Sequence, residues 1–252
     1  MFRPRIIPVL LLKNRILVKS EQFKNHTYIG DPINAVKIFN ELQADELVFL
    51  DIDATRENRL ISLDFIKDVG EEANMPFSAG GGVRSIEDIR QIIEAGAEKV
   101  IVNSYAAENP DFIREASETF GSSTIVVCMD VKKKRFGGIQ TWVKAGTKSS
   151  GYSPVDFAKL MEAKGAGEII VQSMEKDGTR MGYDIDLIRS ISEAVAIPVI
   201  ALGGAGSEND LVRAYHEGYA NGLAAGSLFV YQGTKKGVLI SYPEKNRIKF
   251  LF

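Results

Sequence analysis

The most constraining feature of this 252-residue chain is a regular alternation of two kinds of segment. Short apolar runs, of the length expected for buried parallel strands, alternate with amphipathic stretches that predict helices. Eight strand–helix units predict an α/β fold with a single domain over residues 1–252, a closed (β/α)8 TIM barrel whose site lies on the loops after the strands. The eight apolar runs are residues 5–12, 46–51, 75–79, 99–103, 124–129, 168–172, 197–202 and 222–225.

Helix-start signals stand between several of these runs. A polar residue before proline fixes a first helical turn, and a serine with an aspartate three residues later forms a capping box. Residues 132–150 form the longest irregular stretch, and within it 139–143 predicts an excursion beyond the fifth strand. The tail after Ser227 has only a weak helical pattern. The signals are Asp31-Pro32, Ser85-x-x-Asp88, Asn109-Pro110, Ser153-Pro154 and Ser207-x-x-Asp210.

The chain also repeats itself at an offset of 122 residues, since 168 − 46 = 122. The run Glu46–Asp51 recurs as Glu168–Ser173, and Gly81-Gly82 recurs as Gly203-Gly204. Such a repeat predicts two half-barrels, about 1–122 and 123–252, with a similar site on each.

Each half contains a glycine-rich loop between an odd-numbered strand and a helix, at 80–82 and 203–206. Without Cβ atoms the backbone can turn tightly and direct amide N–H groups at an anion. A single loop of this kind is more often just a tight turn, but a symmetric pair favours phosphate binding. Two phosphates on opposite sides of the mouth, the end of the barrel where the strands end, predict an elongated bis-phosphate ligand.

Composition excludes several classes of protein. The net charge is −2 with both signs interspersed, which gives neither a nucleic-acid footprint nor a membrane patch. No apolar run approaches the ~20 residues of a membrane span, and the N-terminus lacks a signal peptide. The lone Cys128 lies in an apolar run, so we expect a structural thiol, no disulfide and a cytoplasmic location.

The motifs resemble those of the cyclase subunit of imidazole glycerol phosphate synthase, to about residue 230. The sister isomerase of histidine synthesis shares the repeat but is less similar in the second and sixth strands. The resemblance implies a barrel of the ribulose-phosphate-binding type without a metal or other cofactor. It rests on residues 5–8, 30–32, 45–51, 80–85, 165–168, 173–179, 182–184 and 203–206, and on Asp130.

In that family a partner glutaminase, bound as a heterodimer, makes ammonia that crosses the barrel. The ammonia attacks a bis-phosphorylated formimino ribonucleotide in a lyase reaction of histidine biosynthesis. By motif, Asp130 matches one of two acid–base aspartates, and Lys19 matches a lysine of the mobile loop after the first strand. The phosphate-binding positions are Gly82, Asn103 and Ser104 on one side and Asp177, Gly178, Gly204, Ala225 and Gly226 on the other.

The second catalytic aspartate of the family falls on Leu11. Leucine transfers no proton, and general acid–base catalysis is worth ~10²–10⁴ in rate, so cyclisation should be nearly lost. Asn14-Arg15 and Ser20 also depart from the family pattern. Strand alternation would place Asp53 on one face with Asp51, where it partly replaces the missing acid. The plainer interpretation of Asp53 is a solvated carboxylate at the rim.

The family's ammonia gate is intact at its four positions, Arg5, Glu46, Lys99 and Glu168. These residues start strands, so they belong to the floor, the end of the barrel opposite the mouth. Charges there can simply cap the barrel, because this end usually serves stability. All four at the family's positions favour an ammonia entrance.

These observations leave three hypotheses. The chain is a cyclase that tolerates Leu11, or a conduit that passes ammonia to another acceptor, or a phosphate-binding pseudoenzyme. Divergent family members are associated with polysaccharide biosynthesis in bacteria, where a sugar amidotransferase uses such ammonia. The chain resembles that branch, because it has Leu11 together with an intact floor. The pseudoenzyme hypothesis would leave the charged floor unexplained. Neighbouring genes for sugar nucleotides or for histidine would separate the first two.

Overall fold

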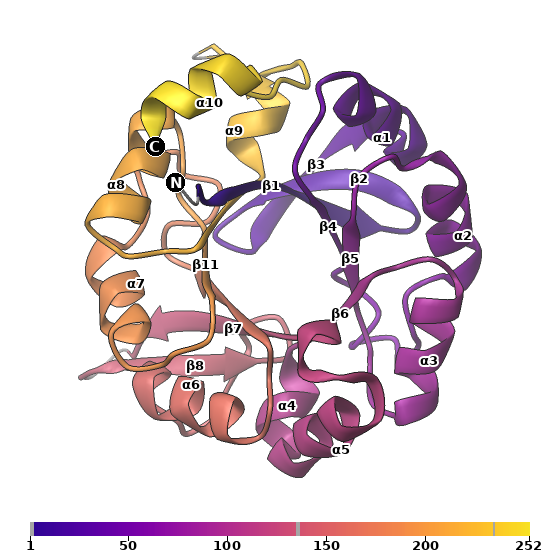
Figure 1. Ribbon diagram of the computed structural model, residues 1–252, viewed down its shortest axis with the longest axis vertical. Coiled ribbons are helices and arrows are strands. Elements are labelled where there is room, and N and C mark those ends of the chain that lie inside the picture. The colour runs from indigo at the N-terminus through magenta and orange to yellow at the C-terminus, as the bar shows by residue number, and fades with distance from the viewer. Residues whose placement is uncertain (1–2, 135–136, 234) are drawn as a thin grey trace.

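Eight parallel strands close into a barrel with the helices outside it, as Figure 1 shows. The computed structural model describes residues 3–134, 137–233 and 235–252. Pairing of β1 with both β4 and β12, and of β7 with β10, closes the ring. The predicted barrel is therefore confirmed, with the strands within a few residues of the expected runs. In ring order they are β1 (Arg5–Lys13), β4 (Leu47–Asp51), β5 (Phe77–Gly80), β6 (Lys99–Val102), β7 (Ile125–Lys133), β10 (Glu168–Ser173), β11 (Val199–Leu202) and β12 (Gly222–Ala225).

The helices begin where the sequence signals predict. Asp31, Ser153 and the capping boxes of Ser85 and Ser207 all bond to first-turn amides. Ser62 and Asp184 are two further caps without a following proline or a capping box. The barrel helices are α1 (Pro32–Glu41), α2 (Leu63–Glu72), α3 (Ile86–Glu94), α5 (Pro110–Phe120), α6 (Pro154–Ala163), α7 (Ile185–Ser192) and α8 (Glu208–His216), with the short α4 (Ser104–Glu108) and η1 (Ser122–Thr124).

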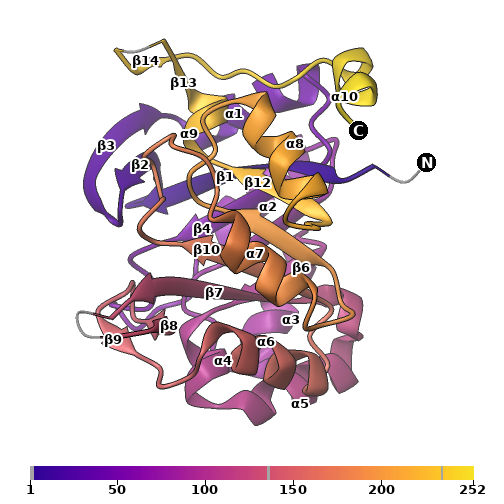
Figure 2. The same ribbon diagram turned by 90° about the vertical axis from the view of Figure 1, so that its left-hand side faces the viewer.

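Two hairpins extend from the mouth, one after the first strand of each half. Residues 139–143 form β8, which pairs with β7 and with β9 (Lys148–Ser149), as predicted. The other hairpin was not predicted: β1 continues into β2 (Ile16–Glu21) and β3 (Lys24–Gly30). Asn14 and Arg15 turn the chain there with φ of 50° and 62°. Figure 2 shows both hairpins at the end opposite the chain termini.

The internal repeat is visible in strand pairing. Leu47 pairs with Phe77 between β4 and β5, and Ile169 pairs with Val199 between β10 and β11. Each residue of the second pair stands 122 positions after its counterpart in the first, so the strands of the two halves are paired in the same register. β1 and β7 each open a half and stand four strands apart in the ring, so their inner residues face each other across the barrel axis.

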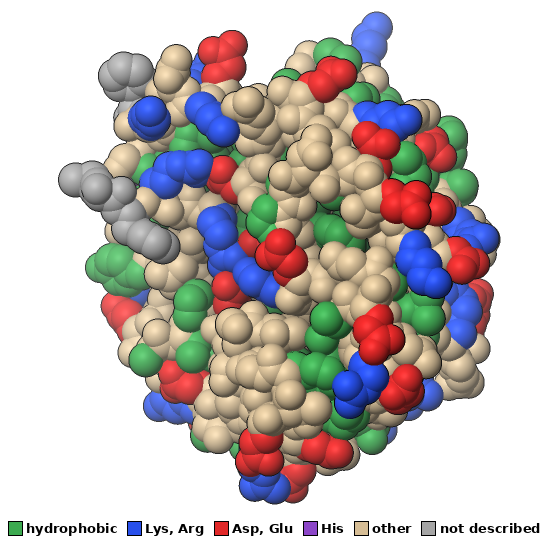
Figure 3. Space-filling view, turned by 45° about the vertical axis from the view of Figure 1, so that its right-hand side comes forward, with side chains coloured by type: hydrophobic (Ala, Val, Ile, Leu, Met, Phe, Trp, Pro, Cys, Tyr) green, Lys and Arg blue, Asp and Glu red, His purple; other side chains and the backbone are tan. Residues whose placement is uncertain are grey.

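Two apolar cores hold the barrel together. The larger lies between strands and helices and includes Phe39, Phe49 and Phe157. The smaller fills the barrel itself, with Ile7, Val9, Val48, Ile101, Val126, Cys128, Ile170, Ile200, Leu202 and Ala224, all buried. In the described residues no helix has the length and apolar character needed to cross a membrane. Figure 3 shows acidic and basic side chains interspersed on one face.

The C-terminal tail replaces a regular eighth helix. It consists of the short helix α9 (Ser227–Val230), a small hairpin of β13 (Tyr231–Gln232) and β14 (Gly237–Val238), and the last helix, α10 (Lys245–Leu251). Tyr242 ties this tail to the floor. Its hydroxyl donates to Ile6 O at 3.0 Å and accepts from Asp45 N at 3.1 Å.

Tyr242→Phe should lower the free energy of unfolding by ~1–3 kcal/mol, because two buried backbone groups lose a partner. Urea unfolding measures this change. Tyr28→Phe is the matched control, since the Tyr28 side chain is 62% exposed and its loss should change little. Equal effects of the two substitutions would contradict a structural role for the Tyr242 hydroxyl.

Candidate functional site

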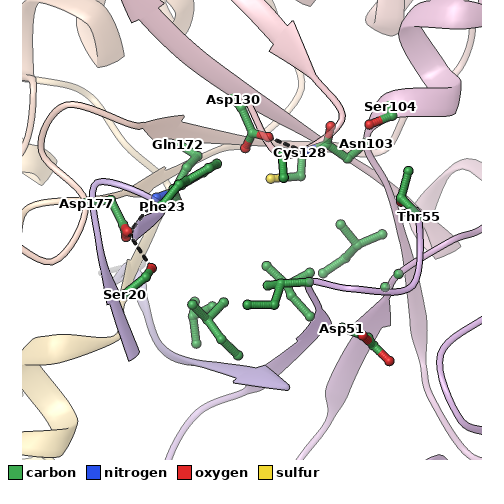
Figure 4. A pocket seen from close by; sticks show the side chains of 18 of the residues that line it. Ser20, Phe23, Asp51, Thr55, Asn103, Ser104, Cys128, Asp130, Gln172 and Asp177 are labelled. Carbon is green, nitrogen blue, oxygen red and sulfur yellow. Dashed lines mark hydrogen bonds between the residues drawn. The ribbon is translucent and has the colours of Figure 1, made fainter. Parts of the chain in front are cut away.

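A cavity of about 680 Å³ opens at the mouth of the barrel. Its wall is built by the loops after the strands and by both hairpins. Figure 4 shows Asp177 and Ser20 on one side of the cavity and Ser104 and Thr55 on the other. A cavity at the carboxyl ends of the strands is where barrels of this class place their chemistry.

Leu11 and Asp130 lie on opposite walls of this cavity, on β1 and β7. The Leu11 side chain packs with Leu50 at the upper edge of the inner apolar core. The wall of β1 is therefore apolar at the height where the wall of β7 carries its carboxyl group. Leu11 extends the inner core toward the mouth.

Asp130 is buried, and its carboxyl group accepts from Asn103 Nδ2 at 3.1 Å. Burial raises the pKa of Asp130 to about 7, the Asn103 hydrogen bond opposes this rise, and nearby Asp177 adds to it. A carboxyl group with this pKa can hold or release a proton near neutral pH. Cys128 faces the same interior two residues earlier, and burial raises its thiol pKa, in line with the expected structural thiol.

The first candidate anion site is formed by Gly82, Asn103 and Ser104, which all line the cavity. Gly82 has φ +75°, and a Cβ there would collide with Arg59 O. Packing of the 53–59 loop thus requires this glycine whether or not a ligand binds. Among the described residues, no protein acceptor is recorded for the Gly82 amide. That N–H is therefore available to an anion, and phosphate binding here stays a prediction.

The second candidate anion site carries more charge than the first. The Asp177 carboxylate accepts from Ser20 Oγ at 3.0 Å and from Gln172 Nε2 at 3.1 Å. Burial raises the pKa of Asp177, while the Ser20 bond and the Lys19 ammonium oppose the rise. The remaining predicted residues line the same wall of the cavity: Gly178, Gly204, Ala225 and Gly226.

Lys19 was expected on a loop, and this expectation is wrong. It lies within β2, where pairing with β1 folds the segment back over the mouth. Its ammonium donates to Val9 O at 2.5 Å and lies so close to Gly226 that a Cβ at that glycine would collide with it. Burial lowers the pKa of Lys19 to about 8, against the attraction of Asp177. The first half of the chain thus supplies a cation to the second anion site.

The expectation that Asp53 shares a strand face with Asp51 is also wrong, because β4 ends at Asp51. Asp51 accepts from Arg59 Nη1 at 2.5 Å and from the amides of Asp53 and Ala54, so it shapes the loop that follows. Asp53 is buried and pairs with Arg56 at 2.8 Å, so it is not the solvated carboxylate of the plainer interpretation either.

At the floor, the four gate candidates meet in one ring of alternating charge. Arg5 contacts Glu46 at 2.5 Å and Glu168 at 2.8 Å. Lys99 closes the ring, at 3.4 Å from Glu46 and 3.1 Å from Glu168. Burial lowers the pKa of Arg5, but the facing carboxylates outweigh this and leave it raised. Ser78 donates to Glu46 at 2.8 Å, which satisfies one more oxygen of the most buried carboxylate.

Several residues that shape the cavity were not singled out from the sequence. Gln172 holds Asp177, and Arg59 holds Asp51. Ser20, which the sequence marked only as a departure from the family pattern, also holds Asp177. Lys144 N donates to Ser104 Oγ at 2.9 Å, from the turn between β8 and β9. No motif marks these contacts, because they form only when the loops and hairpins fold around the mouth.

Comparison with known proteins places the chain in a family. The model of the histidine biosynthesis protein family matches residues 5–236. The chain belongs to this family. A protein of Alkaliphilus metalliredigens, named imidazole glycerol phosphate synthase subunit HisF, is 45% identical over 92% of each chain. The resemblance seen in the motifs is thus confirmed as membership among HisF-like subunits.

Other family members match over more of their length. A Pseudomonas aeruginosa protein, named provisionally as imidazole glycerol phosphate synthase subunit hisF2, is 43% identical over 98% of this chain and 99% of its own. A Leptospira interrogans protein, named provisionally as subunit HisF, is 42% identical over 100% of both. The HisF subunit of Streptococcus sanguinis matches over 92% of each chain.

Replacing Asp130 by asparagine should change the free energy of unfolding in a pH-dependent way, because the pKa of Asp130 is raised in the folded state. Because the folded state holds this proton more tightly than the unfolded chain, the stabilising contribution is full below about pH 4 and is lost as pH rises through about 7. Asp130→Asn should therefore change little at pH 4 and add ~1–3 kcal/mol to the free energy of unfolding at pH 8.

Chemical denaturation at both pH values measures the difference. Asp111→Asn is the control of opposite sign, because hydrogen bonding to Lys164 lowers the pKa of that exposed carboxyl group. An equal gain from Asp130→Asn at pH 4 and pH 8 would mean that ionisation of Asp130 is not the cause.

Proposed function

We propose that this barrel takes ammonia from a partner glutaminase at its floor and passes it to an acceptor at its mouth. The use that fits best is amidation of a sugar of a bacterial surface polysaccharide, in the cytoplasm. The observation that carries this proposal is Leu11, which stands opposite Asp130 where a two-acid cyclase needs a second carboxylate. A sugar amidotransferase would then act as a third protein.

The floor supports an entrance for ammonia. The floor ring has two positive and two negative side chains, so it is neutral overall. Separating the side chains would therefore leave no net charge at the floor. The Glu46 and Glu168 side chains are only 3% and 13% exposed, and Lys99 is 17% exposed. Arg5 is 30% exposed, so a docked partner would have to cover this side of the ring to keep water out. Ammonia lost to water would be protonated and would no longer be a nucleophile.

The interior supports transport of a neutral molecule. Above the floor ring, the inner core of the barrel consists of aliphatic side chains with Cys128 as the one sulfur among its described members. A neutral ammonia molecule can cross an apolar passage far more readily than an ammonium ion, because the ion would need partners there. Leu11 and Leu50 prolong this passage up to the cavity.

The relatives are consistent with a distinct branch. The provisionally named proteins of Pseudomonas aeruginosa and Leptospira interrogans match 98–100% of this chain. The HisF subunits of Alkaliphilus metalliredigens and Streptococcus sanguinis match 92%. The chain therefore shares more of its length with the provisionally named proteins. A heterodimer with a glutaminase is common to both alternatives.

The alternative is a histidine-biosynthesis cyclase, a lyase that closes the imidazole ring with the same ammonia. Three observations favour it. Asp130 keeps a pKa of about 7, and Asp177 is a second buried carboxyl group with a raised pKa on the same cavity. Both candidate phosphate sites also remain. Asp177 is engaged by Ser20 and Gln172, however, which leaves it less available for proton transfer than a free acid.

Complementation decides between the two. In a bacterium that lacks its own cyclase subunit, this protein should not support growth without histidine, because loss of one acid–base group costs ~10²–10⁴ in rate. Leu11→Asp should restore only part of the growth, since the flanking hairpin has also changed. Growth at the normal rate with the unaltered chain would refute the conduit proposal.

Substitution of the floor tests the ammonia entrance. Lys99→Ala should uncouple glutamine hydrolysis by the cognate glutaminase from use of its ammonia, so that ammonia appears in solution while the fold remains intact. The control is Lys164→Ala, which removes a surface ion pair with Asp111 of 2.7 Å. If the cognate glutaminase neither binds this barrel nor hydrolyses glutamine faster in its presence, the ring is only structural.

A further inference from the structure

Each hairpin at the mouth contacts the anion site of the opposite half. The β2–β3 hairpin belongs to the first half, yet Lys19 and Ser20 reach Gly226 and Asp177 in the second. Gln22 strengthens this contact, because its amide and its side chain donate to Asp177 O and Glu175 O, both at 2.9 Å. The second anion site is thus completed by a segment from the other side of the repeat.

The β8–β9 hairpin does the same in the reverse direction. It belongs to the second half, and the Lys144 amide donates to Ser104 Oγ at 2.9 Å in the first anion site. The Lys144 ammonium lies 3.4 Å from Glu108, at the end of the α4 helix that Ser104 begins. Lys144 also lines the same cavity as Gly82 and Asn103. Each hairpin therefore brings a lysine to the opposite half.

The backbone at this turn is held in an unfavourable conformation. Lys144 and Ala145 have φ of 55° and 53°, in the left-handed region that residues with a Cβ rarely occupy. Thr147 holds the turn, since its amide and hydroxyl donate to Lys144 O at 3.3 and 2.7 Å. Gly146 leaves no room for a Cβ beside Met174 and faces Phe23 of the other hairpin. Strain fixed by such packing often marks a functional position.

The charges around the first candidate anion site indicate a role for Lys144. Gly82, Asn103 and Ser104 offer only neutral donors, and the Asp130 carboxyl group beside Asn103 disfavours an anion when ionised. Two other cations on the cavity are engaged elsewhere: Arg56 pairs with Asp53, and Arg84 donates to Asn58 and to Thr55 O. Lys13 also lines the cavity, but it lies at the end of β1 and, among the described residues, no contact ties it to Ser104. The Lys144–Glu108 pair, by contrast, is long and exposed, so a phosphate could displace the carboxylate.

We propose that Lys144 is the cationic ligand of the first anion site, as Lys19 is of the second, and that it binds a phosphate group. This inference assumes that the candidate site at Gly82 takes an anion, and it does not depend on which acceptor uses the ammonia. The two half-barrels then exchange hairpins, so each phosphate of an elongated ligand is held partly by the half that does not contain its glycine loop. Binding at one end would order the hairpin of the other half.

The test is a titration of the ¹⁵N-labelled full-length chain with inorganic phosphate, followed by the amide signals of Gly82 and Ser104 and of Gly204 and Gly226. In the unaltered protein both pairs should shift. Lys144→Met should weaken binding at Gly82 and Ser104 roughly five- to tenfold, because a charge-assisted hydrogen bond is lost. It should leave Gly204 and Gly226 unchanged. Lys19→Met should give the reverse pattern.

Lys148→Met is the matched control, because it removes the same charge from the same hairpin at β9. Glu108→Gln should tighten binding at Gly82, since the competing carboxylate is gone. If Lys144→Met and Lys148→Met weaken phosphate equally, Lys144 acts only through overall charge and the proposal is overturned. If phosphate shifts neither pair in the unaltered chain, the two candidate anion sites do not bind phosphate and this inference falls with them. The ammonia conduit is tested separately at Lys99.

Discussion

A charge buried inside a barrel must be paired or hydrogen-bonded, and the interior of this molecule meets that demand only at its two ends. Inward-facing residues alternate along each strand, so β1 presents Arg5 at the floor, then Ile7, Val9 and Leu11 toward the mouth. The floor ring pairs its four charges with one another. At the mouth, buried charges such as Asp177 find their partners on a hairpin that reaches across the barrel axis. Between the two ends the column is apolar.

Leu11 changes the balance of this arrangement. An aspartate there would place a second carboxyl group across the cavity from Asp130, which accepts a hydrogen bond from Asn103 and whose pKa is raised to about 7 by burial. With leucine the β1 wall joins the inner core, and the apolar interior extends up to the cavity. The same substitution thus removes a proton carrier and lengthens the route for a neutral molecule, which is why it favours a conduit over a cyclase.

The sequence predicted the parts that local pattern determines. Strand runs, the capping boxes at Ser85 and Ser207 and the 122-residue register follow from neighbouring residues, and all appear in the structure. The β2–β3 hairpin was missed because its exposed, polar strand β3 lacks the apolar run of a buried strand. Lys19 was therefore placed on a loop. Asp53 was misjudged because strand alternation was continued past the end of β4.

The exchange of hairpins explains why these errors lie at the mouth. A segment that leaves its own half and packs on the other is fixed by partners more than 100 residues away, as in Ser20 with Asp177. Such contacts leave no local signal, yet they place Lys19 beside Gly226. Since Phe23 and Gly146 bring the two hairpins together over the cavity, movement of one disturbs the other. Each hairpin therefore contacts both the candidate anion site of the opposite half and the other hairpin, whereas the floor ring lies at the far end of the barrel.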